Sequence, residues 1–462
     1  MSEQSSVIKH FNKFIKRVCP LYLIDHAGRA GNGFFQTLFD GHPEVLSIPW
    51  IHYCTSYFVT EFAEEDLVDS RKAHEFWSTK SYFRFFYAEL SEDDHNLVHR
   101  FGGDPETQID RLKIRKTFDK IILRKNSVSR KEVIYASFYA IAEALGRDLD
   151  KIKFLILTDS ISLRMESVLC GFSGKIIDQA IKDSPEARFI HLVRDPRAGF
   201  ASTNHQFVNQ LGNVYALRPS NIPQKFMELL RCQFSMEGPF VFGFLTLYFL
   251  ETFRAIEEKK QASPERFLTI RNEDLNLQFV STIKKLAEDL QVSFNRTWED
   301  PDYCPTMLGK EWQGTGGYSN RYQTKRTGPL QNDPDEVSRN VVGPNAYVTQ
   351  RWKKRLSQNE ISLLDYFFRH EIQAYGYEFL RTKPFGNSEF FIWLKMALPF
   401  RGEIPHPIWL RRSKNWKEFM NRFSYYLALP AFYLIGRLTL LMNKKCRKIL
   451  FHDHPKVCLY KK

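Results

Sequence analysis

The sequence predicts an α/β fold in which helices flank a central parallel sheet, followed by a basic, amphipathic helical extension at the C-terminus. Three observations predict this fold class. Short apolar runs alternate with longer helical patterns between residues 21 and 271, which is typical of parallel strands joined by crossover helices. A turn with three glycines separates the first apolar run from the first helical pattern. The excess of basic residues lies after residue 380.

The expected elements follow one another in the order that such a sheet requires. At 462 residues and 43% hydrophobic content, the chain suffices for one large domain with appendages. The predicted elements are a strand over 21–25, a helix over 33–40, a helical region over about 60–148 ending in a helix over 131–145, a strand over 152–157, a helix over 163–182, a strand over 188–193, a helix over 196–208, helices through 224–258 and a strand over 266–271.

The turn after the first strand has the composition of a phosphate-binding loop. Gly28, Gly31 and Gly33 allow a tight turn that brings backbone N–H groups near an anion. The spacing from Gly28 to Gly33 is that of a nucleotide P-loop, but two phenylalanines stand where Lys and Ser/Thr would bind phosphate and Mg²⁺. The sheet is therefore expected to be P-loop-like, but its glycine turn lacks the residue that would bind the metal. Arg29 is the cation within the turn. A glycine-rich turn that binds no ligand is the alternative interpretation.

A second segment with the character of an anion site follows the apolar run 188–193. Arg194 would emerge at the carboxyl end of a parallel strand, where open α/β sheets bind ligands. Pro196 suits the first turn of a helix, and Ser202 lies about two helical turns beyond Arg194. Both side chains could then reach one phosphate. The alternative is that Arg194 and Asp195 simply pair at the strand end.

Five segments, in this order, resemble the sulfotransferases that use 3′-phosphoadenosine-5′-phosphosulfate (PAPS), in particular the carbohydrate and tyrosylprotein type and its bacterial members. They are HAGRAGNGFF at 26–35, LFDGHPEV at 38–45, VRDPRAGFAS at 193–202, FLTIRNEDL at 267–275 and the segment 351–379, which has a Trp-Lys near its start and a Gly-Tyr near its end. The resemblance covers about residues 18 to 380 and implies a sulfotransferase domain over 21–380.

The resemblance implies a sulfuryl transfer from PAPS to a hydroxyl group, with no metal. Arg29 would neutralise charge on the leaving 5′-phosphate. Arg194 and Ser202 would bind the 3′-phosphate that distinguishes this donor from ATP. The residues expected to surround the 5′-phosphate are Gly28, Gly31, Asn32, Gly33 and Phe34, chiefly through backbone N–H groups. The Asn32 side chain is either a further donor or simply tolerates a left-handed turn.

The catalytic base is less clearly marked than the donor site. Relatives place a Glu shortly after the HPEV run, whereas this chain has no carboxylate there. His52 and His26 are the candidate bases, because a neutral imidazole suits proton transfer near pH 7. Ordinary structural histidines are the alternative. Thr158 stands where relatives have Lys, and Asp159 is expected to accept a proton or to orient a base.

The segment 302–345 shows little periodicity and is expected to form a lid over the donor. Loops of this length are uncommon unless they are functional. Ser319 and Arg321 are the residues expected to contact the donor. The helical region 60–148 is expected to shape the choice of acceptor.

The extension 381–462 carries 17 Lys or Arg against 4 Asp or Glu, so that its net charge of +13 equals that of the whole chain. Its longest apolar run, 423–442, approaches the length of a membrane span but contains Pro430 and Arg437. An interfacial segment on an anionic membrane fits this pattern better. A basic helix packed on the catalytic domain is the alternative. Nucleic acid is not an expected partner, because the basic residues are mixed with long apolar runs.

The N-terminal segment 1–20 is amphipathic and is expected either to lie on the same membrane face or to pack under the sheet. It has no signal-peptide core, and the seven cysteines have no metal-site spacing. These features favour a cytoplasmic location, peripheral on a membrane. The expected acceptor is a hydroxyl of a lipid, glycolipid or glycan, and the oligomeric state is left open. A phosphotransferase that uses ATP and an inactive, scaffold-like relative are the competing functions.

Overall fold

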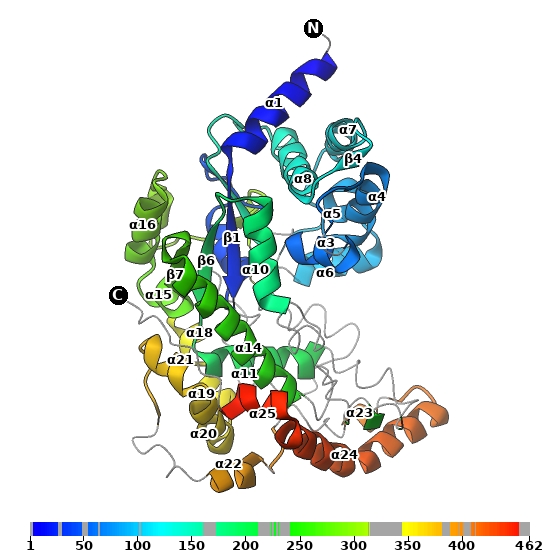
Figure 1. The fold of residues 1–462 in the computed structure, drawn as a ribbon, viewed down its shortest axis with the longest axis vertical. Coiled ribbons are helices and arrows are strands. Elements are labelled where there is room, and N and C mark those ends of the chain that lie inside the picture. Colours follow the sequence, from blue (N-terminus) through cyan, green and yellow to red (C-terminus); the bar gives the residue numbers. More distant parts are fainter. Residues whose placement is uncertain are drawn as a thin grey trace.

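A computed structural model provides the structure of the chain (Figure 1). It describes residues 3–25, 30–48, 54–62, 65–100, 103–159, 172–210, 223, 226, 227, 230, 241–312, 314, 344–380, 389–396, 398–400, 408–411 and 413–451.

The central sheet has five parallel strands in the order β2-β5-β1-β6-β7. The strands are β1 (Cys19–Asp25), β2 (Val45–Leu46), β5 (Phe154–Thr158), β6 (Arg188–Val193) and β7 (Phe267–Arg271). Nearly all their residues are buried, as expected for parallel strands covered on both faces. The α/β class and four of the strands are thus confirmed. The two-residue edge strand β2 was not predicted, because its length gives no period to detect.

The helices surround this sheet, and those between β2 and β5 form the expected helical region (Figure 1). A short antiparallel pair, β3 (Val68–Asp69) with β4 (Ser127–Val128), interrupts that region. The helices are α1 (Glu3–Arg17), α2 (Asn32–Leu38), α3 (Cys54–Phe62), α4 (Ser70–Lys80), α5 (Arg84–Tyr87), α6 (Glu92–Arg100), α7 (Arg111–Ile122), α8 (Arg130–Ala144), α10 (Phe172–Asp183), α11 (Pro196–Gln210), α14 (Val241–Ala262), α15 (Asn272–Leu277), α16 (Phe279–Leu290), α18 (Ala346–Gln350), α19 (Trp352–Arg355), α20 (Gln358–Phe367), α21 (Arg369–Ala374), α22 (Glu389–Met396), α23 (Ile408–Arg411), α24 (Trp416–Met442) and α25 (Lys444–Phe451).

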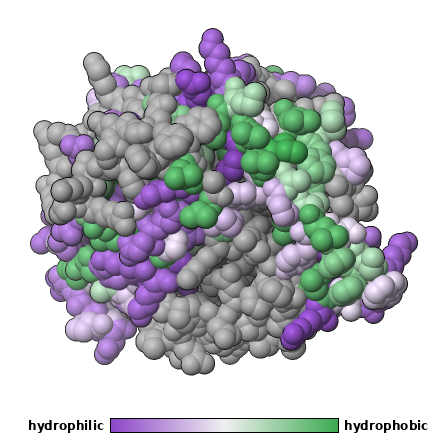
Figure 2. Space-filling model, turned by 90° about the horizontal axis from the view of Figure 1, so that it is seen from below, coloured by the Kyte–Doolittle hydropathy of each residue, from purple (hydrophilic) through white to green (hydrophobic). Residues whose placement is uncertain are grey.

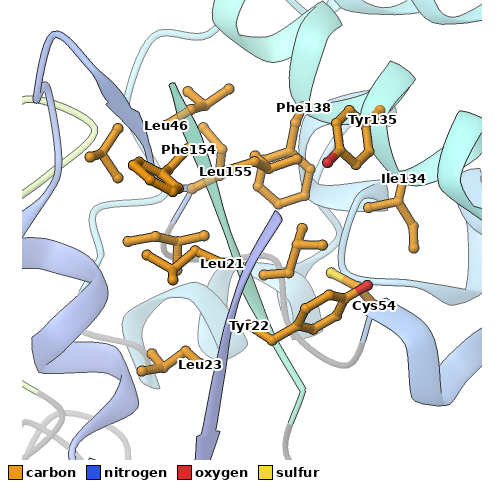
Figure 3. Packing of buried hydrophobic residues seen from close by; sticks show 14 of the residues in the cluster. Leu21, Tyr22, Leu23, Leu46, Cys54, Ile134, Tyr135, Phe138, Phe154 and Leu155 are labelled. Atoms are coloured by element: carbon orange, nitrogen blue, oxygen red, sulfur yellow. The ribbon is translucent and has the colours of Figure 1, made fainter. Parts of the chain in front are cut away.

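Helix α8 supplies much of the first hydrophobic core. Ser129 and Glu132 form a capping box that fixes its start, which satisfies N–H groups that otherwise lack partners. Tyr135 and Phe138 then face the side chains of the sheet (Figure 3). At the side of this core the Thr55 hydroxyl donates to the Tyr22 hydroxyl over 3.4 Å. The core therefore joins the sheet to the helical region by packing and by a buried polar contact.

The N-terminal helix α1 packs on the domain by its apolar face. Phe11 and Phe14 are buried, and their rings contact Tyr135 and Tyr139 of α8 edge-on. Figure 1 places α1 at the opposite end of the molecule from α24. The interpretation that residues 1–20 share a membrane face with the C-terminal extension is therefore wrong, because this apolar face is already covered by α8.

A second hydrophobic core lies beyond the carboxyl ends of the strands and is built around α14. Leu247, Phe249 and Phe253 of this helix are buried, and the helix overlaps the region 224–258 that was predicted to be helical. Helices α11, α20, α21, α24 and α25 contribute to the same cluster. The C-terminal extension is therefore partly packed on the rest of the chain, through α11, α14, α20 and α21.

Glu371, in α21, is a buried carboxyl group in this second core. Its Oε2 atom has no hydrogen-bond partner among the residues that the structure describes. Burial, reinforced by the negative charge of Glu257, raises the pKa of Glu371 from 4.5 to about 8. The folded protein therefore holds a proton near neutral pH that the unfolded chain has released.

This proton makes stability depend on pH. Between pH 4.5 and about 8 the folded state binds one proton more at Glu371, so the free energy of unfolding should fall by about 1.4 kcal/mol per pH unit from this group. We expect Glu371→Gln to be a few kcal/mol more stable than the wild type at pH 8.5 and indistinguishable at pH 4. Urea unfolding across this range measures the difference. Glu258→Gln, at a side chain 63% exposed, is the control that should show none.

Candidate functional site

The carboxyl ends of three neighbouring strands carry residues of the predicted site. β1 leads into the glycine turn, β5 into Asp159 and β6 into Arg194, and β1 lies between the other two. The order in which strands are added to the sheet reverses at β1, since β2 and β5 lie on one side of it whereas β6 and β7 lie on the other. Open α/β sheets bind ligands at such a switch point. In Figure 1 the β1 arrow points toward the half of the molecule that contains α11 and α14.

The described part of the glycine turn has the geometry of an anion cradle. Gly31 has φ +106° and caps α2, which begins at Asn32. The first intrahelical bond is donated by the Phe35 N–H to the Gly31 carbonyl, over 2.9 Å. The N–H groups of the preceding three residues, Asn32, Gly33 and Phe34, therefore have no acceptor within the helix, as at any helix start. The residues of the turn that precede Ala30, namely His26, Gly28 and Arg29, lie outside the described residues.

The turn is held by Asn272, the first residue of α15 directly after β7, which was not among the predicted site residues. The Asn272 side-chain N–H donates to the Ala30 carbonyl over 2.7 Å, in a buried position. A Cβ on Gly31 would lie 2.3 Å from the same Asn272 nitrogen. Asn272 belongs to the FLTIRNEDL segment, and the resemblance of this segment to the sulfotransferases was the one signal in the sequence that could have pointed to it. Glycine at 31 therefore serves both the backbone conformation and the approach of Asn272.

Gly31→Ala is expected to disrupt this contact. A left-handed conformation costs a non-glycine residue about 1–3 kcal/mol, and the Asn272 amide would also have to move. We expect a lower melting temperature and weaker binding of 3′,5′-adenosine bisphosphate, both measurable by thermal shift. Gly41→Ala is the matched control, because Gly41 has φ +72° but nothing within 4 Å of its Cβ position. Equal nucleotide binding by both variants would show that the Gly31 turn is not part of the site.

At the end of β6, Arg194 and Arg197 have different surroundings. Arg197 binds Asp195 through two hydrogen bonds of 2.7 and 2.9 Å and Asp365 through one of 2.9 Å, and its guanidinium lies over the Trp352 ring. Asp195 is therefore held by Arg197, and the alternative that it simply pairs with Arg194 is wrong. Arg194 is 4% exposed and donates to the Val348 carbonyl of α18 over 3.2 Å.

Glu273 links β6 to the segment after β7. It accepts the Asp195 backbone N–H over 3.1 Å and the Tyr377 hydroxyl over 2.8 Å. Burial and the charge of Asp195 raise the pKa of Glu273, whereas the positive charge of Arg194 opposes that rise. The end of β6 is thus a buried, hydrogen-bonded cluster in which Arg194 is a source of positive charge. Ser202 lies in α11 and is also buried.

At the end of β5, Asp159 fixes the start of α3. One carboxylate oxygen accepts the Thr55 N–H over 2.9 Å, and the other accepts the Ser56 N–H over 3.0 Å and the Ser56 hydroxyl over 2.9 Å. Burial raises the pKa of Asp159 despite these hydrogen bonds. The observed arrangement is that of a positioning residue, which holds Thr55 three residues after His52. The neighbouring Thr158 hydroxyl is buried and has no hydrogen-bond partner among the described residues.

The LFDGHPEV run has a structural role in this chain. Asp40 accepts the Thr306 hydroxyl and the Gly309 N–H, each over 2.8 Å, and thereby holds the hairpin of β8 (Thr306–Met307) and β9 (Lys310–Glu311). Glu44 binds Lys153 and the Ser293 N–H. The Asp40 contacts join the start of the segment 302–345 to the end of α2, and the Glu44 contacts join the run to the residues before β5 and after α16. They explain the run without a catalytic role.

The remaining predicted site residues are outside the described part of the chain. These are His52, Ser319 and Arg321, together with most of the segment 302–345. Their roles stay predictions. Within the described ranges, no group of three or more His, Cys, Asp or Glu side chains is arranged to hold a metal ion.

Comparison with known proteins gives limited similarity. No family model matches the sequence, and no curated protein matches it. The solved structures that match this chain include three sulfotransferases.

The first is the sulfotransferase domain from the curacin biosynthetic pathway, with a TM-score of 0.41 and 14% identity over 74% of this chain and 93% of that chain. The second is the sulfotransferase domain from the Synechococcus PCC 7002 olefin synthase, with a TM-score of 0.36 and 15% identity over 73% and 88%. The third is the sulfotransferase STF9 from Mycobacterium avium, with a TM-score of 0.32 and 11% identity over 81% and 82%.

Proposed function

We propose that this chain is a sulfotransferase that moves the sulfuryl group of PAPS to a hydroxyl of a lipid, glycolipid or glycan. The observation that carries the proposal is the pairing of two sites on adjacent strands. One is a glycine turn after β1 that lacks the metal-binding Lys-Ser/Thr pair, and the other is a buried Arg194 after β6. A donor with phosphate groups at both its 5′ and 3′ positions matches two such sites, whereas ATP matches one.

The 5′-phosphosulfate would lie at the turn after β1. The N–H groups of Asn32, Gly33 and Phe34 would donate to it, and Arg29 would lie beside the bridging oxygen. The 3′-phosphate would reach Arg194 and Ser202 on the neighbouring elements. Because the Val348 carbonyl now accepts from Arg194, a phosphate would take the place of that acceptor and form a stronger, charge-assisted bond.

The transfer step is an in-line substitution at sulfur. The acceptor oxygen forms a bond to sulfur while the bond from sulfur to the bridging oxygen of the phosphosulfate breaks. The electron pair leaves with the 5′-phosphate of adenosine bisphosphate, where Arg29 would stabilise the new charge. The acceptor proton would pass to an imidazole, either His52 or His26. Asp159 would act indirectly, by positioning His52, because it fixes the start of the helix that follows His52.

Thermal shift with 3′,5′-adenosine bisphosphate and with Mg-ATP tests the donor assignment without any acceptor. We expect the bisphosphate to raise the melting temperature and Mg-ATP to raise it less at equal concentration, since ligand binding to the folded state adds stability. A larger shift with Mg-ATP would instead support a phosphotransferase. Binding of the bisphosphate without sulfuryl transfer to any lipid or glycan fraction would support an inactive relative.

A further inference from the structure

Helix α24 presents an apolar face to the outside along its whole length. Its exposed residues are Trp416, Lys417, Met420, Phe423, Leu427, Pro430, Ala431, Leu434, Leu438 and Met442. They recur every three or four positions and so share one face of the helix. From Met420 onward none of them is charged or polar. In Figure 2, which views this side of the molecule, apolar side chains form a band on the right.

The two arginines of α24 face inward instead, whereas Lys417, in its first turn, is exposed. Arg437 is 5% exposed and donates to the Met396 carbonyl over 3.1 Å, as does the Tyr433 hydroxyl over 2.8 Å. Arg422 is buried and binds Glu418 over 2.6 Å. A surface helix in water has the reverse arrangement, with polar residues outward. The outer face of α24 therefore suits an apolar surrounding.

The inner face of α24 is anchored in the second hydrophobic core. Phe432 and Leu440 are buried there, and a Cβ on Gly243 of α14 would lie 2.7 Å from Leu440. By length and composition, α24 is the one helix of the described residues that could cross a membrane. If α24 crossed a membrane, it would lose its contacts with α14, and Arg437 would lie in the hydrocarbon region, which is energetically costly. The packing therefore favours a helix that lies in the plane of a membrane surface.

The positive charge of α24 and its flanking residues indicates which kind of apolar surface this helix would bind. Residues 413–451, all described, contain eight Lys or Arg and one Glu. Lys444, Lys445, Arg447 and Lys448 follow the helix and are exposed, and Lys414 and Lys417 lie at its start. Two copies of so basic a surface would repel each other, whereas an anionic lipid surface attracts it. Nucleic acid would satisfy the charge but not the apolar band.

We infer that the outer face of α24 docks on an anionic lipid bilayer, in which its apolar side chains enter the boundary between headgroups and acyl chains. Trp416, 72% exposed at the start of the helix, is placed for headgroup depth, where Trp is preferred. The inference concerns a binding surface and is independent of the proposed sulfuryl transfer.

Sedimentation of the full-length protein with vesicles tests this inference. Vesicles of phosphatidylcholine with 30% phosphatidylserine, a content set at roughly that of a strongly anionic leaflet, are compared with phosphatidylcholine alone. We expect at least about tenfold tighter binding to the anionic vesicles, and release by alkaline carbonate. A protein that stays in the supernatant with anionic vesicles overturns the inference. Retention after carbonate treatment overturns the in-plane placement in favour of a span.

The variant Leu427→Ser/Leu434→Ser/Leu438→Ser removes three side chains of the band, each 45–68% exposed, and should leave folding intact. We expect it to lose at least about tenfold in affinity for anionic vesicles, in proportion to the apolar area removed. The matched control is Leu67→Ser/Leu112→Ser/Leu277→Ser, at leucines 55–60% exposed elsewhere, which should bind like the wild type. Equal loss in both variants, or none in the first, contradicts the inference. A dimer in lipid-free ultracentrifugation that only the first variant abolishes would identify a second copy as the occupant instead.

Discussion

Arg29→Ala is expected to lower the rate of sulfuryl transfer by about 10² to 10³, by analogy with the loss of one preorganised donor at a developing oxyanion. The sequence has no Lys-Ser/Thr pair after the turn, and in the proposed function protein charge takes the place of the metal. Arg29 is the cation within that turn. Its contribution should grow as the bridging oxygen gains charge, so the rate should fall more than the affinity for adenosine bisphosphate.

Transfer of radiolabelled sulfuryl from PAPS to a lipid or glycan fraction measures this effect. Arg29→Lys is the conservative control and should keep most of the rate, because the positive charge remains near the bridging oxygen. If Arg29→Ala and Arg29→Lys lose the same amount, charge at this position is not what stabilises the leaving group. If Arg29→Ala transfers as fast as the wild type, the role of Arg29 is refuted.

Arg194→Ala is expected to weaken binding of 3′,5′-adenosine bisphosphate by roughly 10- to 100-fold, which corresponds to the loss of a charge-assisted hydrogen bond of about 1.5–3 kcal/mol. Its guanidinium is buried at the end of β6, where the low dielectric strengthens its interaction with an anion. Glu273, whose pKa responds to Arg194, is its buried acidic neighbour. The substitution should therefore remove binding energy to the 3′-phosphate and leave the contacts to the adenosine unchanged.

Arg188→Ala is the matched control for this substitution. Arg188 lies at the amino end of the same strand, where it donates to the Asp289 carbonyl over 3.3 Å and stacks on Phe154. It is remote from the carboxyl edge, so nucleotide affinity should not change. Equal weakening by both substitutions would point to a general loss of stability rather than a lost phosphate contact.

The sheet and most of its helices could be predicted from the sequence because buried parallel strands are short, apolar and separated by helical patterns. Strand β6 matches its prediction at both ends, and α8 within one residue of each. The Pro196 start of α11 follows from the preference of proline for the first helical turn. Local sequence was sufficient in these cases because the deciding interactions lie within a few residues.

The sequence could not show contacts between distant segments. Asn272 lies 242 residues from the Ala30 carbonyl that it binds, and no local sequence pattern predicts a contact over that separation. The sequence also could not decide between a ligand-binding Arg194 and one that pairs with Asp195. Arg194 lies one residue from Asp195 and Arg197 lies two, and only the structure shows that Arg197 makes the pair while it also contacts Asp365 and Trp352. Composition suggested that the extension contacts a membrane, but only the structure shows which face of α24 is exposed.

The most direct test of the donor site is calorimetric titration of the wild type and Arg194→Ala with two ligands, 3′,5′-adenosine bisphosphate and adenosine 5′-phosphate. The ligands differ only in the 3′-phosphate and the proteins only in Arg194, so the four affinities form a double-mutant cycle. We predict that the wild type prefers the bisphosphate by roughly 10- to 100-fold and that Arg194→Ala loses most of this preference, keeping at most the part that Ser202 supplies. An unchanged preference in Arg194→Ala, or no preference in the wild type, would contradict the assignment of Arg194 to the 3′-phosphate.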